Sequence, residues 1–320
     1  MQLKKNIQPY NVTSAAVLAH TGNSAFNDLN SACHFSKKIS KNCFDFSPFY
    51  HAIKELYPER AECDLPDTEF LSWLIGSAEG DGSFVMINRN KIATFVIIQS
   101  TQDVDILECI QLRLGFGKVH PQGKRTSRYI VQDRRGLYIL YSLFNGNLIF
   151  PSRKAQFKGW VEWGGLGSVK KGQSIRPITD RKILPSLHNG WIAGLTDSEG
   201  CFTASFLCNS NAFRLRFILS QKGDLNLPVL SRFIELFEGG NIEAHSIKGN
   251  YSYILSGVKN SYKIYRYFVL HPLRSKKAES YKLWRSLHVE ILQKNHLIPD
   301  RRALLAEKAK KINSIRRKSK

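Results

Sequence analysis

Several features are scarce in this 320-residue sequence, and each scarcity excludes a class of protein. No apolar run approaches the roughly 18 residues of a membrane-spanning helix, which argues against an integral membrane protein. The six cysteines form no C-x-x-C pair and no cluster with histidine at zinc-binding spacing, so no structural zinc site is expected. Acidic residues are also few: 26 Asp and Glu face 47 Lys and Arg, a net charge of +21. Such a charge indicates a polyanionic partner, most often nucleic acid.

What the sequence does contain is an internal repeat. The segment 73-WLIGSAEGDGSF-84 returns as 191-WIAGLTDSEGCF-202, with Trp, two Gly and Phe at identical offsets. Each copy is followed by two alternating apolar runs around an Asn-rich turn, which is typical of a β-hairpin. A helical pattern, two further strand-like runs and a closing helix complete each half. Each half is therefore predicted as α-β-β-α-β-β-α, and the chain is interpreted as a tandem duplication.

The predicted fold class is α+β. Two pseudo-symmetric αββαββα halves, each a curved antiparallel sheet with helices on one face, are joined by a linker. The predicted domains are an N-terminal extension of unknown role (1–64), the first half (65–163), the linker (164–184), the second half (185–294) and a basic C-terminal tail (295–320). For the tail, a solvated terminus and a nucleic acid contact both stay open.

The two repeated segments are rich in small residues at helical spacing. Gly76 and Gly80 lie four positions apart and share one helix face, and Gly194 and Ser198 share the equivalent face in the second copy. Small residues at this spacing let helix backbones approach closely. We therefore expect the two motif helices to pair with each other across a pseudo-twofold axis.

Each motif helix is expected to end in a carboxylate, Asp81 or Glu199. Gly82 and Gly200 follow these acids and suit the left-handed conformation that often ends a helix. Paired helices would bring the two carboxylates together at helix C-termini, where mutual repulsion and the helix dipole both disfavour negative charge. Divalent cations would relieve this conflict, because Mg²⁺ prefers carboxylate oxygens. Two such ions beside a phosphate would support phosphodiester hydrolysis.

The paired segments resemble a known motif. Residue by residue, 74-LIGSAEGDG-82 and 192-IAGLTDSEG-200 are similar to the sequence LAGLIDADG. The chain thus resembles the single-chain, two-motif LAGLIDADG homing endonucleases, many of which are intron-encoded. The second copy is the closer match, because the first has Ser77-Ala78 where the family usually has two aliphatic residues. The resemblance covers residues 66–292 of the chain.

The resemblance implies a metal site. The last acid of each motif, Asp81 or Glu199, would bind the catalytic metals, and the preceding Gly80 and Ser198 are assigned to the same site. The implied cofactor is Mg²⁺, with two or three divalent cations at the helix interface.

The resemblance also implies supporting catalytic residues. Gln99 and Gln221 match a polar residue that the family places at the end of the second strand, near the attacking water. Lys259 matches a basic residue after the fourth strand. Arg135 takes that place in the first half, with Arg134 as the alternative.

Further residues are expected to contact DNA. Lys154 and Lys277 match a family Lys near the start of the last helix, where a plain phosphate contact is the simpler role. One face of each strand would carry polar side chains into the major groove. The residues expected on that face are Asn88, Asn90, Thr94, Arg214 and Arg216.

The expected function is a homing endonuclease that cuts both DNA strands at a long, asymmetric target. Two alternatives stay open: an RNA maturase that assists splicing of its host intron, and a non-catalytic DNA-binding protein of the same fold. Intact acids in both motifs favour the nuclease. The expected partners are double-stranded DNA and the host intron RNA, without a membrane, and the expected state is a monomer with an internal pseudo-dimer. The family's frequent place in organellar introns implies a mitochondrial or chloroplast location.

Overall fold

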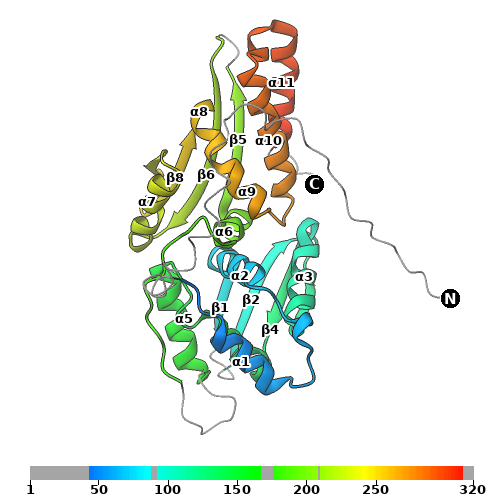
Figure 1. Cartoon of the computed structure of the whole chain (residues 1–320), viewed down its shortest axis with the longest axis vertical. Coiled ribbons are helices and arrows are strands. Elements are labelled where there is room, and N and C mark those ends of the chain that lie inside the picture. The colour runs from blue at the N-terminus through cyan, green and yellow to red at the C-terminus, as the bar shows by residue number, and fades with distance from the viewer. Residues whose placement is uncertain (1–42, 88–91, 167–175, 208–209, 313–320) are drawn as a thin grey trace, which may run out of the picture. The chain divides into compact units, whose positions relative to one another are not determined.

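The computed structural model describes residues 43–87, 92–166, 176–207 and 210–312, which form two similar halves (Figure 1). The elements of the first half are α1 (Ser47–Leu56), α2 (Thr68–Asp81), β1 (Gly82–Ile87), β2 (Ile92–Ser100), α3 (Val104–Leu114), β3 (Lys118–Gln122), β4 (Thr126–Val131), α4 (Arg134–Phe144) and α5 (Pro151–Gly164). Those of the second half are α6 (Trp191–Glu199), β5 (Gly200–Phe206), β6 (Phe213–Lys222), α7 (Leu227–Leu236), β7 (Asn241–Ala244), β8 (Asn250–Ser256), α8 (Val258–Ser261), α9 (Tyr265–Leu270), α10 (Lys277–Leu292) and α11 (Pro299–Ile312). None of the described helices is long and apolar enough to cross a membrane.

Each half is built on a four-stranded antiparallel sheet. The strand order is β1-β2-β4-β3 in the first sheet and β5-β6-β8-β7 in the second. The registers coincide as well: Phe95 pairs with Val131 in the first sheet, and Phe217 pairs with Leu255 in the second. The predicted tandem duplication of an α+β unit is thereby confirmed. The structure adds α4 in the first half and α8 and α9 in the second, between the fourth strand and the closing helix.

The phenylalanine that ends each motif anchors the core of its half. The Phe84 ring lies 5.2 Å from the ring of Trp160 in α5, and the Phe202 ring lies 5.5 Å from that of Trp284 in α10. Tilted aromatic pairs at this distance contribute packing energy beyond the area they bury. The two contacts also show that α5 and α10 are equivalent elements of the repeat.

Helices α2 and α6 pair along their glycine-rich faces, as their spacing predicts. A Cβ atom at Gly76 would lie 2.0 Å from the carbonyl oxygen of Trp191, and one at Gly194 would lie 1.9 Å from that of Trp73. Real side chains do not approach a backbone oxygen so closely, so only glycine permits this packing. The thin helices are therefore explained by direct contact between two backbones.

The glycines that follow the two helices differ from expectation. Gly82 and Gly200 have φ values of −75° and −73°, so neither adopts the left-handed conformation. A Cβ at Gly82 would instead lie 2.4 Å from the carbonyl oxygen of Ala78, and one at Gly200 would lie 2.5 Å from a methyl carbon of Thr196. Glycine is required here because each helix passes directly into a strand, without a turn between them.

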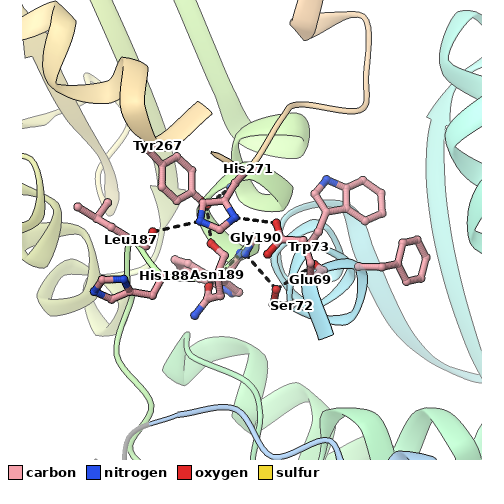
Figure 2. Close-up of polar contacts among 12 residues, drawn as sticks. Glu69, Ser72, Trp73, Leu187, His188, Asn189, Gly190, Tyr267 and His271 are labelled. Atoms are coloured by element: carbon pink, nitrogen blue, oxygen red, sulfur yellow. Dashed lines mark hydrogen bonds and ion pairs between the residues drawn. The ribbon is translucent and has the colours of Figure 1, made fainter. Parts of the chain in front are cut away.

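The opposite end of the helix pair is closed by polar contacts between the halves (Figure 2). His271 lies between two oxygen atoms: its Nδ1 is 2.7 Å from the carboxylate of Glu69 in α2, and its Nε2 is 3.1 Å from the carbonyl of Leu187. The hydroxyl of Ser72 accepts the backbone N–H of Gly190 at 3.0 Å. These contacts fix the entry to α6 against the first half.

Segments outside the repeat fold onto the two halves. Helix α1 packs against α4 and buries Phe49 and Ile53, so the described part of the predicted extension belongs to the first half. Helix α11 packs against α10 and β5 and buries Leu305 and Ile312. Up to residue 312, the predicted tail is therefore a packed helix rather than a solvated terminus.

Candidate active site

The two acids within each motif have different surroundings. The first acids, Glu79 and Asp197, are 1% and 2% exposed. The Trp191 indole N–H donates to Glu79 Oε2 at 2.6 Å, and the Trp73 indole N–H donates to Asp197 Oδ2 at 2.8 Å. Each half thus supplies a buried carboxylate to the tryptophan of the other. A buried polar group costs little only when it is hydrogen-bonded, so these reciprocal pairs fix the halves relative to each other.

The same acids hold the segments that lead into the last helices. Glu79 Oε1 accepts the backbone N–H of Phe150 at 2.7 Å, and Asp197 Oδ1 accepts that of Ser275 at 2.9 Å. Burial raises the pKa of Glu79 to about 7, although its N–H donors favour the ionised form. The first acids therefore hold the two halves and these segments in place.

The second acids gather at one end of the helix pair. Asp81 ends α2 half-buried, and Glu199 ends α6 exposed. The Gln99 side-chain amide donates to Asp81 Oδ2 at 2.5 Å. A Cβ at Gly80 would lie 3.3 Å from Cγ of Glu199, so that side chain passes directly over the end of α2. Both carboxylates also interact electrostatically with the Arg153 guanidinium.

The two glutamines occupy equivalent positions. On β2, the residue paired with Gly82 lies two positions before Gln99, and on β6, the residue paired with Gly200 lies two positions before Gln221. Gln99 is buried and Gln221 is half-buried. Gln221 therefore stands in the same relation to the end of α6 as Gln99 does to the end of α2.

A basic residue that the sequence did not single out lies beside the acids. The Arg153 guanidinium donates to three carbonyls where α2 ends, those of Glu79, Gly80 and Gly82, at 2.7, 2.6 and 3.0 Å. The last carbonyls of a helix lack intrahelical partners and form the negative end of its dipole, so a cation there is stabilising. Burial lowers the pKa of Arg153, while the nearby carboxylates act in the opposite direction.

Lys277 is the counterpart of Arg153 in the second half. Its ammonium donates to the carbonyls of Thr196 and Ser198 at 3.0 and 2.6 Å, where α6 ends. Each of the two cations stands seven residues before the buried tryptophan of its helix, a spacing that would have identified Arg153. Lys277 is 5% exposed, so its predicted DNA contact is contradicted: the side chain caps a helix instead.

The basic residues expected after the fourth strands lie away from the acids. Through Leu219, Gly200 at the end of α6 is level with Tyr253 of β8, and Ser256 ends β8 three positions farther along. Three strand residues span about 10 Å, and Lys259 follows, exposed on α8. Arg135 follows β4 in the same direction, and Arg134 donates to carbonyls at the end of α5. The expected residues thus follow strands that run away from the helix ends, whereas the cations found at the helix ends are Arg153 and Lys277.

Two of the residues expected to contact DNA, Arg214 and Arg216, lie on the outer face of β6. Along β6, Arg214 and Arg216 alternate with buried apolar residues, of which Phe217 is fully buried. Successive side chains of a strand point to opposite faces, so both arginines project from the face turned away from the core. Arg214 is exposed and Arg216 is half-buried.

Other expected DNA contacts are not found. Thr94 is 2% exposed, so it cannot present its hydroxyl to a duplex in this conformation. The Lys154 ammonium lies 3.1 Å from the carboxylate of Asp180 and donates to the next residue's carbonyl at 2.6 Å, so it binds the linker. Asn88 and Asn90 lie outside the described residues.

The family follows from comparison with known proteins. Residues 74–163 and 192–288, together more than half of the chain, match the LAGLIDADG endonuclease family. The chain belongs to this family. It is 38% identical over 255 residues to the probable intron-encoded endonuclease 4 of Neurospora crassa, covering 78% of this chain and 45% of that relative. The chain thus spans less than half the length of that relative.

Two more comparisons bear on this LAGLIDADG chain. It is 26% identical over 188 residues to the intron-encoded RNA maturase bI4 of Saccharomyces cerevisiae, covering 57% of this chain and 26% of that relative. A crystal structure of the LAGLIDADG homing endonuclease I-GzeII in complex with its DNA target superimposes with a TM-score of 0.65 at 19% identity. That superposition covers 77% of this chain and 99% of the other, and the fold is therefore shared.

The LAGLIDADG family implies dependence on a divalent metal, and the donor groups present fit one. Asp81 and Glu199 supply two carboxylates. No cluster of three or more His, Cys, Asp or Glu that could hold a metal occurs within the described ranges. Mg²⁺ suits so sparse a set, because it is bound by one or two carboxylates and keeps water and phosphate ligands. The carbonyls of Gly80 and Ser198 accept from cationic side chains, which leaves the two carboxylates as the groups that would hold the metal.

Proposed function

We propose that this chain is a homing endonuclease that cuts both strands of a long, asymmetric DNA duplex. The observation that carries the proposal is the convergence of Asp81 and Glu199 at the ends of paired helices, one from each half. A single acid per half matches a reaction in which each half acts on one strand. The net charge of +21 supplies the affinity for a polyanion and predicts a steep dependence on salt.

The chemistry at the acids depends on how the chain holds them. Asp81 and Glu199 would hold Mg²⁺, which when bound stabilises charge on the phosphate and lowers the pKa of a coordinated water. Gln99 fixes the orientation of Asp81, and Gln221 is placed to do the same beside Glu199. Arg153 keeps the last carbonyls of α2 hydrogen-bonded and places a positive charge near Asp81 and Glu199.

The two sheets would bind the duplex through their exposed faces. A two-stranded β-ribbon fits the major groove, and Arg214 and Arg216 carry the donor pattern that reads guanine. The two halves differ in sequence along their strands, so the two half-sites would differ as well. The chain would act as a monomer whose halves form an internal pseudo-dimer. An organellar intron as its source is consistent with the name of the Neurospora relative, which is intron-encoded.

The test is cleavage of a library of long DNA duplexes in Mg²⁺ by wild type, Asp81→Asn and Glu199→Gln. Loss of a metal-binding carboxylate removes several kcal/mol of transition-state stabilisation, so we expect each variant to cut about 1,000-fold more slowly. The control is Glu108→Gln, which removes an exposed acid on α3 and should cut like wild type. Full activity in either motif variant would refute the assignment.

A second function, RNA maturation, is favoured by the similarity to the yeast RNA maturase. A maturase does not need the carboxylates, so the same variants separate the functions. Tight binding to a structured intron RNA that survives Asp81→Asn, with no cutting of any duplex by wild type, would identify a maturase. A protein that binds one duplex sequence but never cuts it would be a DNA-binding protein of the same fold.

A further inference from the structure

The side chain of Arg302 connects the C-terminal helix α11 to the β5–β6 hairpin. The Arg302 guanidinium donates to the carbonyls of Leu207, Ser210 and Ala212 at 2.9, 2.6 and 2.8 Å. These carbonyls lie on both sides of the hairpin turn, about ninety residues earlier in the chain. A second nitrogen of Arg302 donates to the carbonyl of His296 at 3.2 Å. Arg302 therefore also contacts the residues just before α11.

Aromatic contacts reinforce the same junction. The Arg302 guanidinium lies 5.3 Å from the ring centre of Phe206, the last residue of β5. The His296 ring packs edge-on against Phe213, the first residue of β6, with 5.0 Å between ring centres. The C-terminal segment therefore touches the hairpin at the end of one strand, in the turn, and at the start of the next.

The helix that carries Arg302 is itself anchored to the core. Leu305 and Ile312 of α11 are buried, and the Ser280 hydroxyl of α10 donates to the Ile312 carbonyl at 2.6 Å. Arg302 thus holds the hairpin in a fixed place relative to α10, because α11 is packed on α10. Helix α11 lies after the repeated region of the sequence, so this contact is not part of the pattern that the two halves share.

The end of the hairpin that Arg302 contacts lies far from the acids and is followed along β6 by Arg214 and Arg216. Phe206 lies six positions beyond Gly200, which follows α6, and six steps along a strand span about 20 Å. That length corresponds to about six base pairs of a duplex. Arg214 and Arg216 follow immediately on β6.

We propose that Arg302 is a positioning residue for target recognition, which fixes the β5–β6 hairpin so that it reads the outer base pairs of one half-site. This inference rests on the proposed function, because it assumes that the exposed sheet face binds a duplex. Arginine suits the task because both of its terminal nitrogens reach the hairpin: Nη2 bonds the three carbonyls named above, and Nη1 lies 3.4 Å from the carbonyl of Asn211. A lysine has only one nitrogen for these contacts. The reading of bases at the centre and in the other half-site should not depend on it.

The test compares wild type with Arg302→Ala and Arg302→Lys by selecting cleaved molecules from a library of randomised DNA duplexes. We expect Arg302→Ala to lose about tenfold of its base preference at positions about six base pairs from the centre on one side. Arg302→Lys should fall between it and wild type. The control is the neighbouring Arg301→Ala, which removes the same charge from an exposed side chain and should keep the full preference.

Hydrogen exchange without DNA gives a second measurement. Amides of residues 210–213 should exchange faster in Arg302→Ala and not in Arg301→Ala, while the amides of α6 keep their protection. Unchanged base preference in Arg302→Ala, or an equal loss in both half-sites, would overturn the inference while leaving the nuclease intact. A wild type that selects no duplex at all would overturn the proposed function and this inference together.

Discussion

The two halves hold their second acids differently, although their backbones follow one plan. Asp81 is half-buried, and the Gln99 amide holds one of its oxygens at 2.5 Å. Glu199 carries one more methylene and is exposed. The two halves have the same contacts beneath the acids. In each half, a glycine contacts the opposite helix, a buried acid accepts from the tryptophan of the other half, and a cation donates to the last carbonyls of the motif helix. The scaffold is thus symmetric, and the reactive surface is not.

The comparison teaches where a duplicated protein can diverge. Gly76 and Gly194 contact backbone atoms of the other helix, so neither half can change without the other. Under the proposed function, Asp81, Glu199 and the outer strand faces meet the substrate, whose two half-sites are free to differ. Variants made in matched pairs, one in each half, therefore show which features are truly equivalent.

The largest effect is expected where the helices touch. Gly76→Ala and Gly194→Ala each place a Cβ about 2 Å from a backbone oxygen of the opposite helix. Overpacking commonly costs about 1–3 kcal/mol, and a clash with backbone exceeds that range, so we expect about 4 kcal/mol or loss of folding for each. Urea unfolding followed by circular dichroism measures the cost.

The matched control for that pair is Gly159→Ala. Gly159 lies within α5 with no atom within 4 Å of an added Cβ, so the change should stabilise the protein by about 0.5–1 kcal/mol through helix propensity. If Gly76→Ala and Gly194→Ala unfolded at the wild-type urea concentration, the close packing of α2 on α6 would be wrong.

A smaller effect is expected on the pH dependence of the unfolding free energy, which Glu79 should control. The pKa of Glu79 is raised to about 7 in the folded protein from an ordinary 4.5, so the folded state binds this proton more tightly than the unfolded state. The stabilisation is fully present below about pH 4.5 and is lost as pH rises to about 7, a change of about 3 kcal/mol. Glu79→Gln should remove this part of the pH dependence, and Asp197→Asn should leave it in place.

Unfolding free energies measured at pH 5 and pH 7.5 test this difference. Glu79→Gln should also lose about 1–3 kcal/mol at the lower pH, because an amide nitrogen cannot accept from the Trp191 indole or from a backbone N–H. Equal pH dependence in wild type and Glu79→Gln would show that Glu79 stays ionised throughout.

The sequence predicted the structure well wherever the same pattern occurred in both halves and the two copies could be compared. Two copies of one pattern predicted the paired helices, the sheets and the equivalent positions of Gln99 and Gln221, because spacing within a strand or helix translates directly into geometry. The left-handed conformation predicted for Gly82 was wrong. Glycine is needed there because a side chain would collide with Ala78, and not because the backbone has a positive φ.

Contacts between distant elements were harder to predict. Arg153 was not predicted because Lys154 was taken as the equivalent of Lys277, whereas the distance to the buried tryptophans pairs Arg153 with Lys277. Lys259 was placed beside the acids because its position after a strand does not reveal which end of the sheet that strand reaches. Arg302 had no counterpart in the repeat, so nothing in the sequence connected it to the hairpin.

The smallest effect is expected at the glutamines, and it bears most directly on the asymmetry of the acids. Gln99→Ala releases Asp81 from its bond, and removing such a supporting group beside a metal ligand typically costs 10- to 100-fold, so we expect about that loss in cutting of one strand. Gln221→Ala should cost only a few-fold, because Glu199 is exposed and gains less from one amide. Supercoiled plasmid carrying the target should then accumulate as nicked circles with Gln99→Ala and far less with Gln221→Ala. Gln293→Ala, an exposed change beyond α10, should give linear product at the wild-type rate. Equal nicking by both glutamine variants would mean that the halves are catalytically equivalent despite their different acids.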